Sequence, residues 1–236
     1  LDDRELWDVT MVIVTADHGH YLGEHGWMGK PYAAPIYDVL AHTPLFVWHP
    51  DSDAMGGRVD ALTSAVDIYA TILETLDVTV PEDTHSRSFL PLLTGDAEHH
   101  RDWALYGYWG STVNVTDGTY TYLHPCNDSI DAEYHSTTML GPYGQFKPPE
   151  PRPDAEAGAF LPYTDCPVWR YSGPSNTRHE EPLLFDVGDD PWQRSNLADR
   201  DDGHRSRMRD LLVDALDALG APENQYERLG LTDNDT

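Results

Sequence analysis

The chain has 236 residues, of which 39% are hydrophobic, so it is long enough to bury a substantial core and is not a disordered protein. It carries 41 acidic and 15 basic residues, and the formal net charge of -26 repels nucleic acid and anionic membrane surfaces. It contains no run of about 18 apolar residues, so the sequence predicts no membrane span.

The first predicted element is a buried strand over residues 10–15. Its run of apolar and β-branched residues is typical of a strand covered on both faces of a parallel sheet. Asp17, His18 and Gly19 follow directly, at the edge where open α/β sheets bind ligands. The carboxylate and the imidazole can supply an oxygen and a nitrogen ligand to a divalent cation. Lys30 then offers the positive charge that an anionic substrate needs.

Further α/β elements are predicted up to about residue 100. A second buried strand is expected at 45–48 and a helix at 62–76, where Ser64 and Asp67 can form a capping box. A turn and the segment 90–93 complete this layer. The helix places its apolar side chains on one face, namely Leu62, Val66, Tyr69, Leu73 and Leu76.

The second half of the chain changes to the pattern of an antiparallel subdomain. Alternating apolar residues on both sides of Asp117-Gly118 predict a hairpin. Prolines are frequent between 140 and 182, so this segment is expected to be an extended connection without regular structure. A strand is expected at 183–186 and a helix from about His204 to Leu219. The helix residues expected to face inward are Met208, Leu211, Leu212, Ala215, Leu216 and Leu219.

Several linked motifs resemble the second signature region of the sulfatase family, within the alkaline phosphatase superfamily. In order they are Thr-Ala-Asp-His-Gly at 15–19, Leu-Gly-Glu-His-Gly at 22–26, Gly-Lys at 29–30, Tyr37, and Thr-Pro-Leu-Phe-Val at 43–47. Similar segments continue downstream to Asn196-Leu197, so the resemblance covers nearly the whole chain. It implies an alkaline phosphatase-like α/β fold, with part of a mostly parallel sheet and helices on both faces over 1–100. An antiparallel-sheet subdomain with a packed helix is implied over 101–236.

The resemblance also implies hydrolysis of a sulfate ester of a small molecule or a carbohydrate. Asp17 and His18 match the pair that binds a divalent cation, usually calcium, and Lys30 matches the lysine that contacts the sulfate. A cation and an ammonium around the sulfate oxygens stabilise the charge that develops as the S–O bond breaks. His25 is close enough in sequence to line the same pocket. The alternatives are a structural turn at Asp17-His18, a solvated surface lysine, and a core histidine at position 25.

The sequence also departs from the family, because the nucleophile motif is absent. Sulfatases convert a cysteine or serine, in a Cys-x-Pro-x-Arg motif or its serine counterpart, to formylglycine. Cys166 is followed by Pro-Val-Trp-Arg, with the proline one position early, and Cys126 does not match either. We interpret Cys166 as structural and leave a bridge between the two cysteines open. Two further metal-binding aspartates are missing, so we expect a carboxyl-terminal fragment that is inactive alone, with formylglycine only in an upstream part.

Other interpretations stay open at this point. The same contacts suit a phosphomonoester or phosphonate ester hydrolase of the superfamily, and a non-catalytic module could keep the fold. The excess of carboxylates and the presence of only two lysines, Lys30 and Lys147, resemble proteins adapted to molar salt, although an ordinary acidic protein has this charge too. The adjacent His99 and His100 are expected at the surface. Neither oligomeric state nor localisation is indicated.

Overall fold

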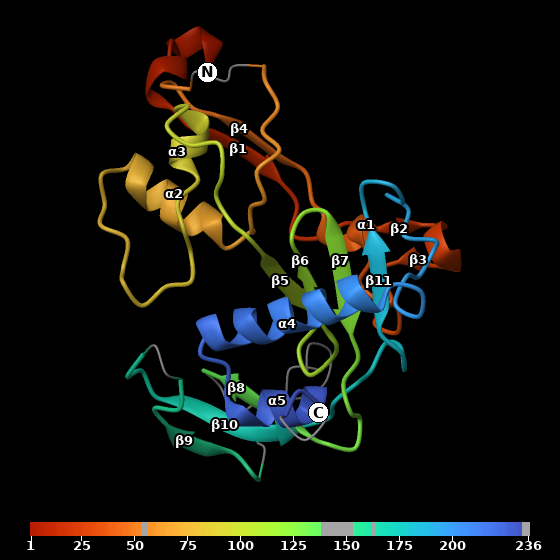
Figure 1. The fold of residues 1–236 in the computed structure, drawn as a ribbon. Coiled ribbons are helices and arrows are strands. Elements are labelled where there is room, and N and C mark those ends of the chain that lie inside the picture. Colours follow the sequence, from red (N-terminus) through yellow and green to blue (C-terminus); the bar gives the residue numbers. More distant parts are fainter. Residues whose placement is uncertain (53–55, 138–152, 162–163, 233–236) are drawn as a thin grey trace.

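The computed structural model describes residues 1–52, 56–137, 153–161 and 164–232, and Figure 1 shows their arrangement. Its strands form four separate sheets. The strands are β1 (Val12–Thr15), β2 (Tyr21–Leu22), β3 (Met28–Gly29), β4 (Leu45–Trp48), β5 (Ala104–Gly107), β6 (Val113–Thr116), β7 (Tyr120–His124), β8 (Ala132–Ser136), β9 (Glu156–Gly158), β10 (Val168–Gly173) and β11 (Leu183–Asp186). The α-helices are α1 (Asp38–Ala41), α2 (Asp67–Thr75), α3 (Leu90–Leu93), α4 (Asp202–Ala218) and α5 (Glu223–Leu229), and short 3-10 turns lie at Asp2–Arg4, Trp7–Val9 and Glu24–Gly26.

The main core lies between a four-stranded antiparallel sheet and helix α4, which crosses it (Figure 1). The strand order is β11-β7-β6-β5, and the predicted hairpin is present as β6 and β7. Its turn is stabilised by Asp117, whose Oδ1 accepts hydrogen bonds from the backbone N–H groups of Thr119 and Tyr120. The strand expected at 183–186 is β11. The sequence therefore predicted most of this layer.

Helix α4 also agrees with its prediction. It begins after Asp201, whose side chain accepts a hydrogen bond from the backbone N–H of His204 at 3.1 Å, so the helix has a capped start. Met208, Leu212, Ala215 and Leu216 are buried. These residues repeat every three or four positions, which is why one side of the helix faces the sheet.

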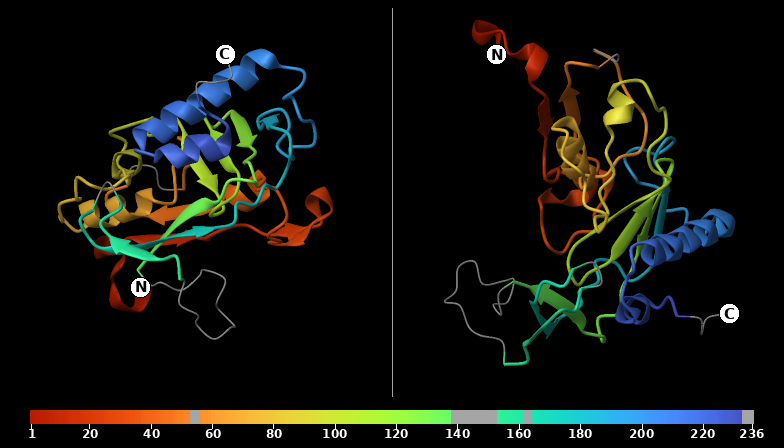
Figure 2. Two further views of the ribbon diagram at one scale, coloured as in Figure 1. Left: turned by 90° about the horizontal axis from the view of Figure 1, so that it is seen from below. Right: turned by 90° about the vertical axis from the view of Figure 1, so that its left-hand side faces the viewer.

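The segment between residues 140 and 182 differs from its prediction. Residues 138–152 and 162–163 lie outside the described part, but β9 and β10 are regular strands that pair with each other, and β10 also pairs with β8. The prolines do not interrupt β10, because none of them lies within Val168–Gly173. Tyr134 of β8 and Tyr171 of β10 stack with ring centres 5.9 Å apart. Figure 2 shows this small sheet beside α5.

Strands β1 and β4 are present where they were predicted, but they are not buried parallel strands. They pair antiparallel with each other, and no third strand of the described residues joins them. Val14 and Phe46 are cross-strand partners and are 58% and 67% exposed. An apolar run predicts that a strand forms, whereas its burial depends on what packs over it. This sheet therefore presents an apolar face.

Helix α2 starts later than the helix predicted at 62–76, and its N-cap residue, Val66, makes no side-chain cap hydrogen bond. The predicted pair is nevertheless in contact at the start of the helix, where the backbone N–H of Ser64 donates to Oδ2 of Asp67 at 2.9 Å. The buried side of the helix carries Asp67, Ala70 and Thr71 rather than the apolar stripe. From that stripe, Val66 and Tyr69 are 52% and 48% exposed.

None of the helices in the described residues is both long and apolar enough to cross a membrane. Cys126 is buried, Cys166 is exposed, and both are free thiols.

Candidate functional site

Asp17 and His18 lie in a bend directly after β1. Oδ1 of Asp17 accepts a hydrogen bond from the backbone N–H of His18 at 3.0 Å, and Oδ2 lies 3.4 Å from Nε2 of His18. Nδ1 of His18 is 2.8 Å from the Gly19 carbonyl oxygen. Because a carbonyl only accepts, Nδ1 carries a proton, and Nε2 is the ring nitrogen that faces Asp17. The bend therefore presents one oxygen donor and one nitrogen donor side by side.

The backbone of helix α1 holds this bend in place. The N–H of Gly19 donates to the Leu40 carbonyl at 2.8 Å. A Cβ atom at position 19 would overlap the Val39 carbonyl oxygen and lie 2.9 Å from the Val39 carbonyl carbon. Only glycine fits such a close approach of two backbones. The donor pair is thus fixed by main-chain packing rather than by its own side chains.

The chemistry of the donor pair suits a divalent cation only in part. The Asp17 side chain is 88% exposed, so its oxygens can reach a ligand, and the hydrogen bond from Nδ1 to a backbone carbonyl is the usual orienting contact of a metal-binding histidine. Calcium takes six to eight ligands, mostly oxygens. No group of three or more possible metal-binding side chains occurs in the part of the chain that the structure describes. Asp17 and His18 therefore fit as part of a larger ligand set.

Lys30 returns to the same region through a short hairpin. Strands β2 and β3 pair Tyr21 with Gly29, so the chain reverses and brings Lys30 back beside His20. A Cβ atom at Gly29 would lie 3.7 Å from Nε2 of His20. The Lys30 side chain is exposed, and Nζ lies 5.9 Å from the centre of the Tyr108 ring. No carboxylate of the described residues forms an ion pair with it, so its charge is available to an anion.

His25 has a different environment. Its ring stacks on Tyr37 with centres 3.8 Å apart, and its backbone is left-handed with φ of 52°. Partial burial lowers the pKa of His25, Arg194 lowers it further, and a hydrogen bond with the Trp192 backbone opposes the shift. The imidazole is therefore neutral at neutral pH. Within the described residues, no hydrogen bond or ion pair joins His25 to the Asp17-His18 bend or to Lys30.

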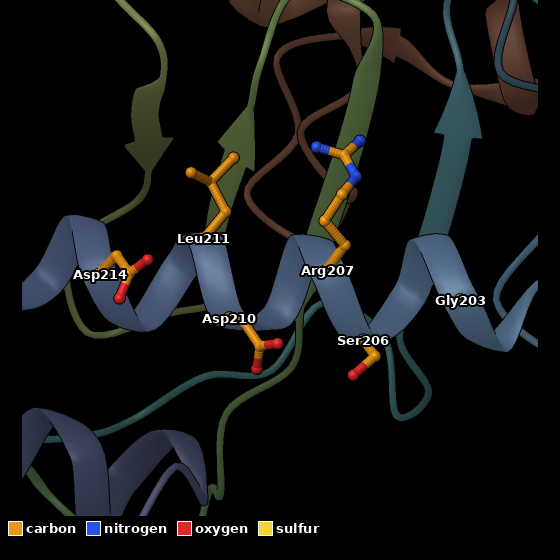
Figure 3. A pocket seen from close by; sticks show the side chains of 6 residues that line it. All are labelled: Gly203, Ser206, Arg207, Asp210, Leu211 and Asp214. Atoms are coloured by element: carbon orange, nitrogen blue, oxygen red, sulfur yellow. The ribbon is translucent and has the colours of Figure 1, made fainter.

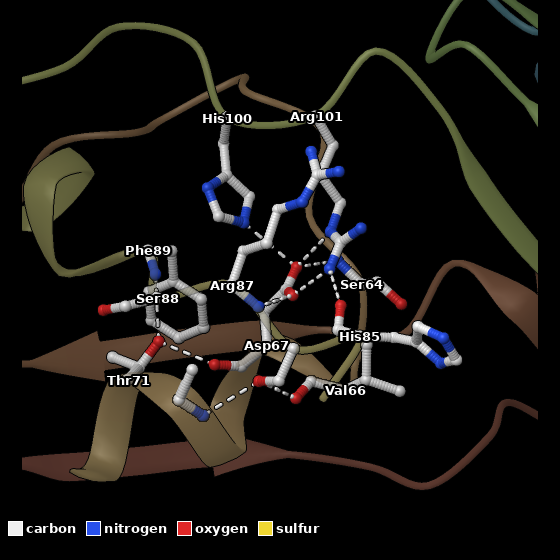
Figure 4. Close-up of polar contacts among 12 residues, drawn as sticks. Ser64, Val66, Asp67, Thr71, His85, Arg87, Ser88, Phe89, His100 and Arg101 are labelled. Carbon is white, nitrogen blue, oxygen red and sulfur yellow. Dashed lines mark hydrogen bonds and ion pairs between the residues drawn. The ribbon is translucent and has the colours of Figure 1, made fainter. Parts of the chain in front are cut away.

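A buried ionic cluster beside α2 was not anticipated from the sequence (Figure 4). Asp67 is fully buried and binds the guanidinium of Arg101, with Nε 2.7 Å from Oδ2. His100 Nε2 lies 3.0 Å from the same oxygen, and the His100 side chain is 8% exposed. The prediction that His100 lies at the surface was wrong, because a buried carboxylate recruits it as a hydrogen-bond partner. The His99 side chain, at 69% exposed, agrees with its prediction.

A second unanticipated group is Arg178, which is far along the chain from Lys30. Its guanidinium carbon lies 3.5 Å from the centre of the Tyr32 ring and 5.1 Å from that of Tyr108. The sequence gives one weak signal that Arg178 has a function, because basic residues are scarce in this chain, with 15 against 41 acidic residues.

A hollow along α4 lies apart from all of these residues. Figure 3 shows Arg207 and Leu211 pointing toward the sheet, while Ser206 and Asp210 point away from it. Arg207 is already paired with Asp117 at 2.8 Å. The hollow contains none of the predicted site residues.

Known proteins similar to this chain agree with the resemblance in the motifs. Residues 23–121 match the family described as N-sulphoglucosamine sulphohydrolase, C-terminal. Human arylsulfatase K is 33% identical over 205 residues, which cover 84% of this chain and 29% of that protein. An N-acetylglucosamine-6-O-sulfatase of Bacteroides thetaiotaomicron is 28% identical over 132 residues, which cover 56% of this chain and 21% of that protein. These matches support the sulfatase family.

Solved structures confirm the expected fold class. The sulfatase-like chain resembles a structure bound to its substrate D-glucosamine-2-N,6-O-disulfate, with a TM-score of 0.63, 18% identity, and coverage of 95% of this chain and 37% of the other. It also resembles the phosphonate monoester hydrolase of Agrobacterium radiobacter, with a TM-score of 0.57, 21% identity, and coverage of 94% and 37%. The matched sulfatase segment includes His25 and Lys30 and begins after the Asp17-His18 bend.

Proposed function

We propose that this chain supplies part of the metal and sulfate site of an enzyme that hydrolyses a sulfate ester. Two observations carry the proposal: Asp17 and His18 present adjacent oxygen and nitrogen donors, and Lys30, after the hairpin that follows, forms no ion pair with a carboxylate of the described residues. An exposed lysine without a carboxylate partner gains no ion pair within the fold, whereas its charge can contact an anionic substrate.

The proposed roles follow from the chemistry of each group. A divalent cation, which we take to be calcium, polarises a sulfate oxygen when it is bound. Asp17 offers its carboxylate to that cation and His18 offers Nε2, while Gly19 keeps both on the α1 backbone. Lys30 contacts the sulfate and neutralises charge on the departing oxygen. His25, neutral and stacked on Tyr37, forms part of the pocket wall.

The remaining parts of this proposed site come from another part of a longer polypeptide. The chain covers only 21% and 29% of the two relatives described above, and the nucleophile motif is absent from it. The exposed cross-strand pair Val14 and Phe46 supports this proposal, since an apolar sheet face is suited to packing against further protein. In this view residues 1–100 complete the α/β domain and 101–236 form its carboxyl-terminal subdomain. The substrate class we propose is a sulfated carbohydrate, which the names of the relatives support.

The first test is to sequence the encoding DNA upstream of Leu1. The second is to measure the activity of the complete polypeptide. We expect an aspartate pair and a Cys/Ser-x-Pro-x-Arg motif, and hydrolysis of an aryl sulfate that requires a divalent cation. Lys30→Gln and Asp17→Asn should each lower kcat/KM by at least tenfold, on the scale of one lost charged contact. Arg58→Gln and Asp60→Asn, which remove an exposed ion pair, are the matched controls. A start codon directly before Leu1 would instead favour a non-catalytic module.

Hydrolysis of a phosphonate monoester is the second candidate, and the structural similarity to such an enzyme favours it. Sulfate and phosphonate esters both present oxygens of a tetrahedral centre to the same cation and ammonium. The ratio of kcat/KM for the two ester types distinguishes the candidates. A higher kcat/KM for the phosphonate ester would show that phosphonate hydrolysis, and not sulfate hydrolysis, is the principal activity.

A further inference from the structure

The side chain of Arg178 lies in the same neighbourhood as Lys30, although it belongs to the carboxyl-terminal half of the chain. Its guanidinium packs against Tyr32, which follows Lys30 by two positions, and it also lies near Tyr108. Lys30 Nζ is 5.9 Å and Arg178 Cζ is 5.1 Å from the centre of the same Tyr108 ring. Two cations from distant parts of the chain therefore lie near the same aromatic ring.

The position of Arg178 is built into the fold. The segment before it is anchored to the turn after β5, since the N–H of Asn176 donates to the Gly110 carbonyl at 2.7 Å. Ser111 Oγ donates to the Asn176 carbonyl at 2.5 Å and accepts from Arg178 Nε at 2.9 Å. Ser111 is fully buried, so this arrangement is fixed rather than a chance surface contact.

The charge of Arg178 is not compensated by a carboxylate of the described residues. Its Nη2 atom is buried there without a hydrogen-bond partner. A buried donor on a charged group normally has one, because leaving it unpaired costs free energy. In a chain with 41 acidic residues, a guanidinium without an acidic partner points to an anion from outside the chain. The Tyr32 ring lies against the guanidinium, so an anion that binds Nη2 would have to displace a neighbouring side chain such as this one.

We propose that Arg178 is a specificity-determining residue that binds a second anionic group, a sulfate or a carboxylate, on the sulfated carbohydrate whose scissile sulfate contacts Lys30. The inference rests on the proposed function. A planar guanidinium binds such oxyanions through paired hydrogen bonds, which a lysine does not reproduce. Lys30 and Arg178 together thereby select sugars with two anionic groups over sugars with one.

Binding of two sugars to the complete polypeptide, measured by calorimetry at low ionic strength with calcium present, tests the proposal. The probes are glucosamine with one O-sulfate and the same sugar with an additional N-sulfate. The disulfated sugar should bind about tenfold more tightly, a gain typical of one charge-assisted contact. Arg178→Gln should remove this preference and leave the affinity for the monosulfated sugar unchanged, and Arg178→Lys should retain part of it.

The control variant is Arg207→Gln, which also removes a guanidinium near a tyrosine ring, 5.4 Å from Tyr120, but lies on α4. It should leave both affinities unchanged, and the thermal midpoint of each variant shows whether it folds. If Lys30→Gln weakens the binding of both sugars but Arg178→Gln leaves the preference for the disulfated sugar intact, the Arg178 inference is overturned and the sulfate site stands. If Lys30→Gln changes neither affinity, or neither sugar binds the complete polypeptide, the sulfate site and the Arg178 inference both fall.

Discussion

Replacing the buried carboxylate of Asp67 should destabilise the fold strongly. Asp67 is 0% exposed and accepts hydrogen bonds from the Arg101 guanidinium, His100 and the backbone N–H groups of Ser64 and Arg87 (Figure 4). Asp67→Asn keeps the size of the side chain but removes the charge and one acceptor oxygen. Arg101, whose side chain is 5% exposed, is then left buried without its counter-charge.

The expected loss is about 3–5 kcal/mol in the free energy of unfolding, the usual cost of removing one partner of a buried ion pair. For a chain of this size it lowers the thermal midpoint by roughly 10 °C. Urea unfolding followed by tryptophan fluorescence at neutral pH measures it. Asp102→Asn is the matched control, because its carboxylate is 84% exposed and pairs with the exposed His99. Equal free energies of unfolding for Asp67→Asn and Asp102→Asn would refute the claim that the buried Asp67 carboxylate stabilises the fold.

The pH dependence gives a second readout of the same cluster. Burial raises the pKa of Asp67, but the hydrogen bonds from Arg101 and the neighbouring backbone outweigh it and hold the pKa below the usual 3.8. A pKa that is lower in the folded chain than in the unfolded chain stabilises the fold above the unfolded value. That stabilisation is lost as the pH falls through the folded value. The difference in the free energy of unfolding between the wild type and Asp67→Asn should therefore narrow in acid. Adding Arg101→Gln to the Asp67→Asn variant should recover part of the lost stability.

Three further predictions concern other parts of the chain. Gly19→Ala should cost roughly 1–3 kcal/mol, because its Cβ overlaps the Val39 carbonyl, whereas Gly203→Ala, with its nearest neighbour at 3.7 Å, should be tolerated in the same urea assay. Burial lowers the pKa of His124 from 6.5 to about 4, so stability should fall by about 3 kcal/mol as the pH drops through that interval, and a His124→Gln variant with the same slope would contradict this. Raising KCl from about 0.1 M to about 1 M shortens the Debye length from about 10 Å to about 3 Å and should raise the thermal midpoint, given the net charge of -26; a lower midpoint would argue against self-repulsion.

Local sequence patterns were sufficient for elements that depend on their own residues. The hairpin at Asp117-Gly118, strand β11 and the inward side of α4 were predicted because turn residues and hydrophobic periodicity act within a few positions of each other. The same holds for the Asp17-His18 bend, which follows β1 as expected. The roles of Asp17, His18, His25 and Lys30 stay predictions.

Contacts between distant residues could not be predicted in this way. The pairing of β10 with β8, the burial of His100 against Asp67, and the exposure of Val14 in β1 all depend on which segments meet in space. The approach of Arg178 to Lys30 is of the same kind, since no periodicity links residues so far apart.

The sequence by itself determined which donors and charges this chain has, and where along it turns and helices begin. Only the tertiary structure decided which of those charges are compensated. Asp67 and Arg101 neutralise each other inside the fold, whereas Lys30 and Arg178 are left around Tyr108 without carboxylates among the described residues. The physical reason is that desolvation and ion pairing depend on three-dimensional distance, to which sequence separation is no guide.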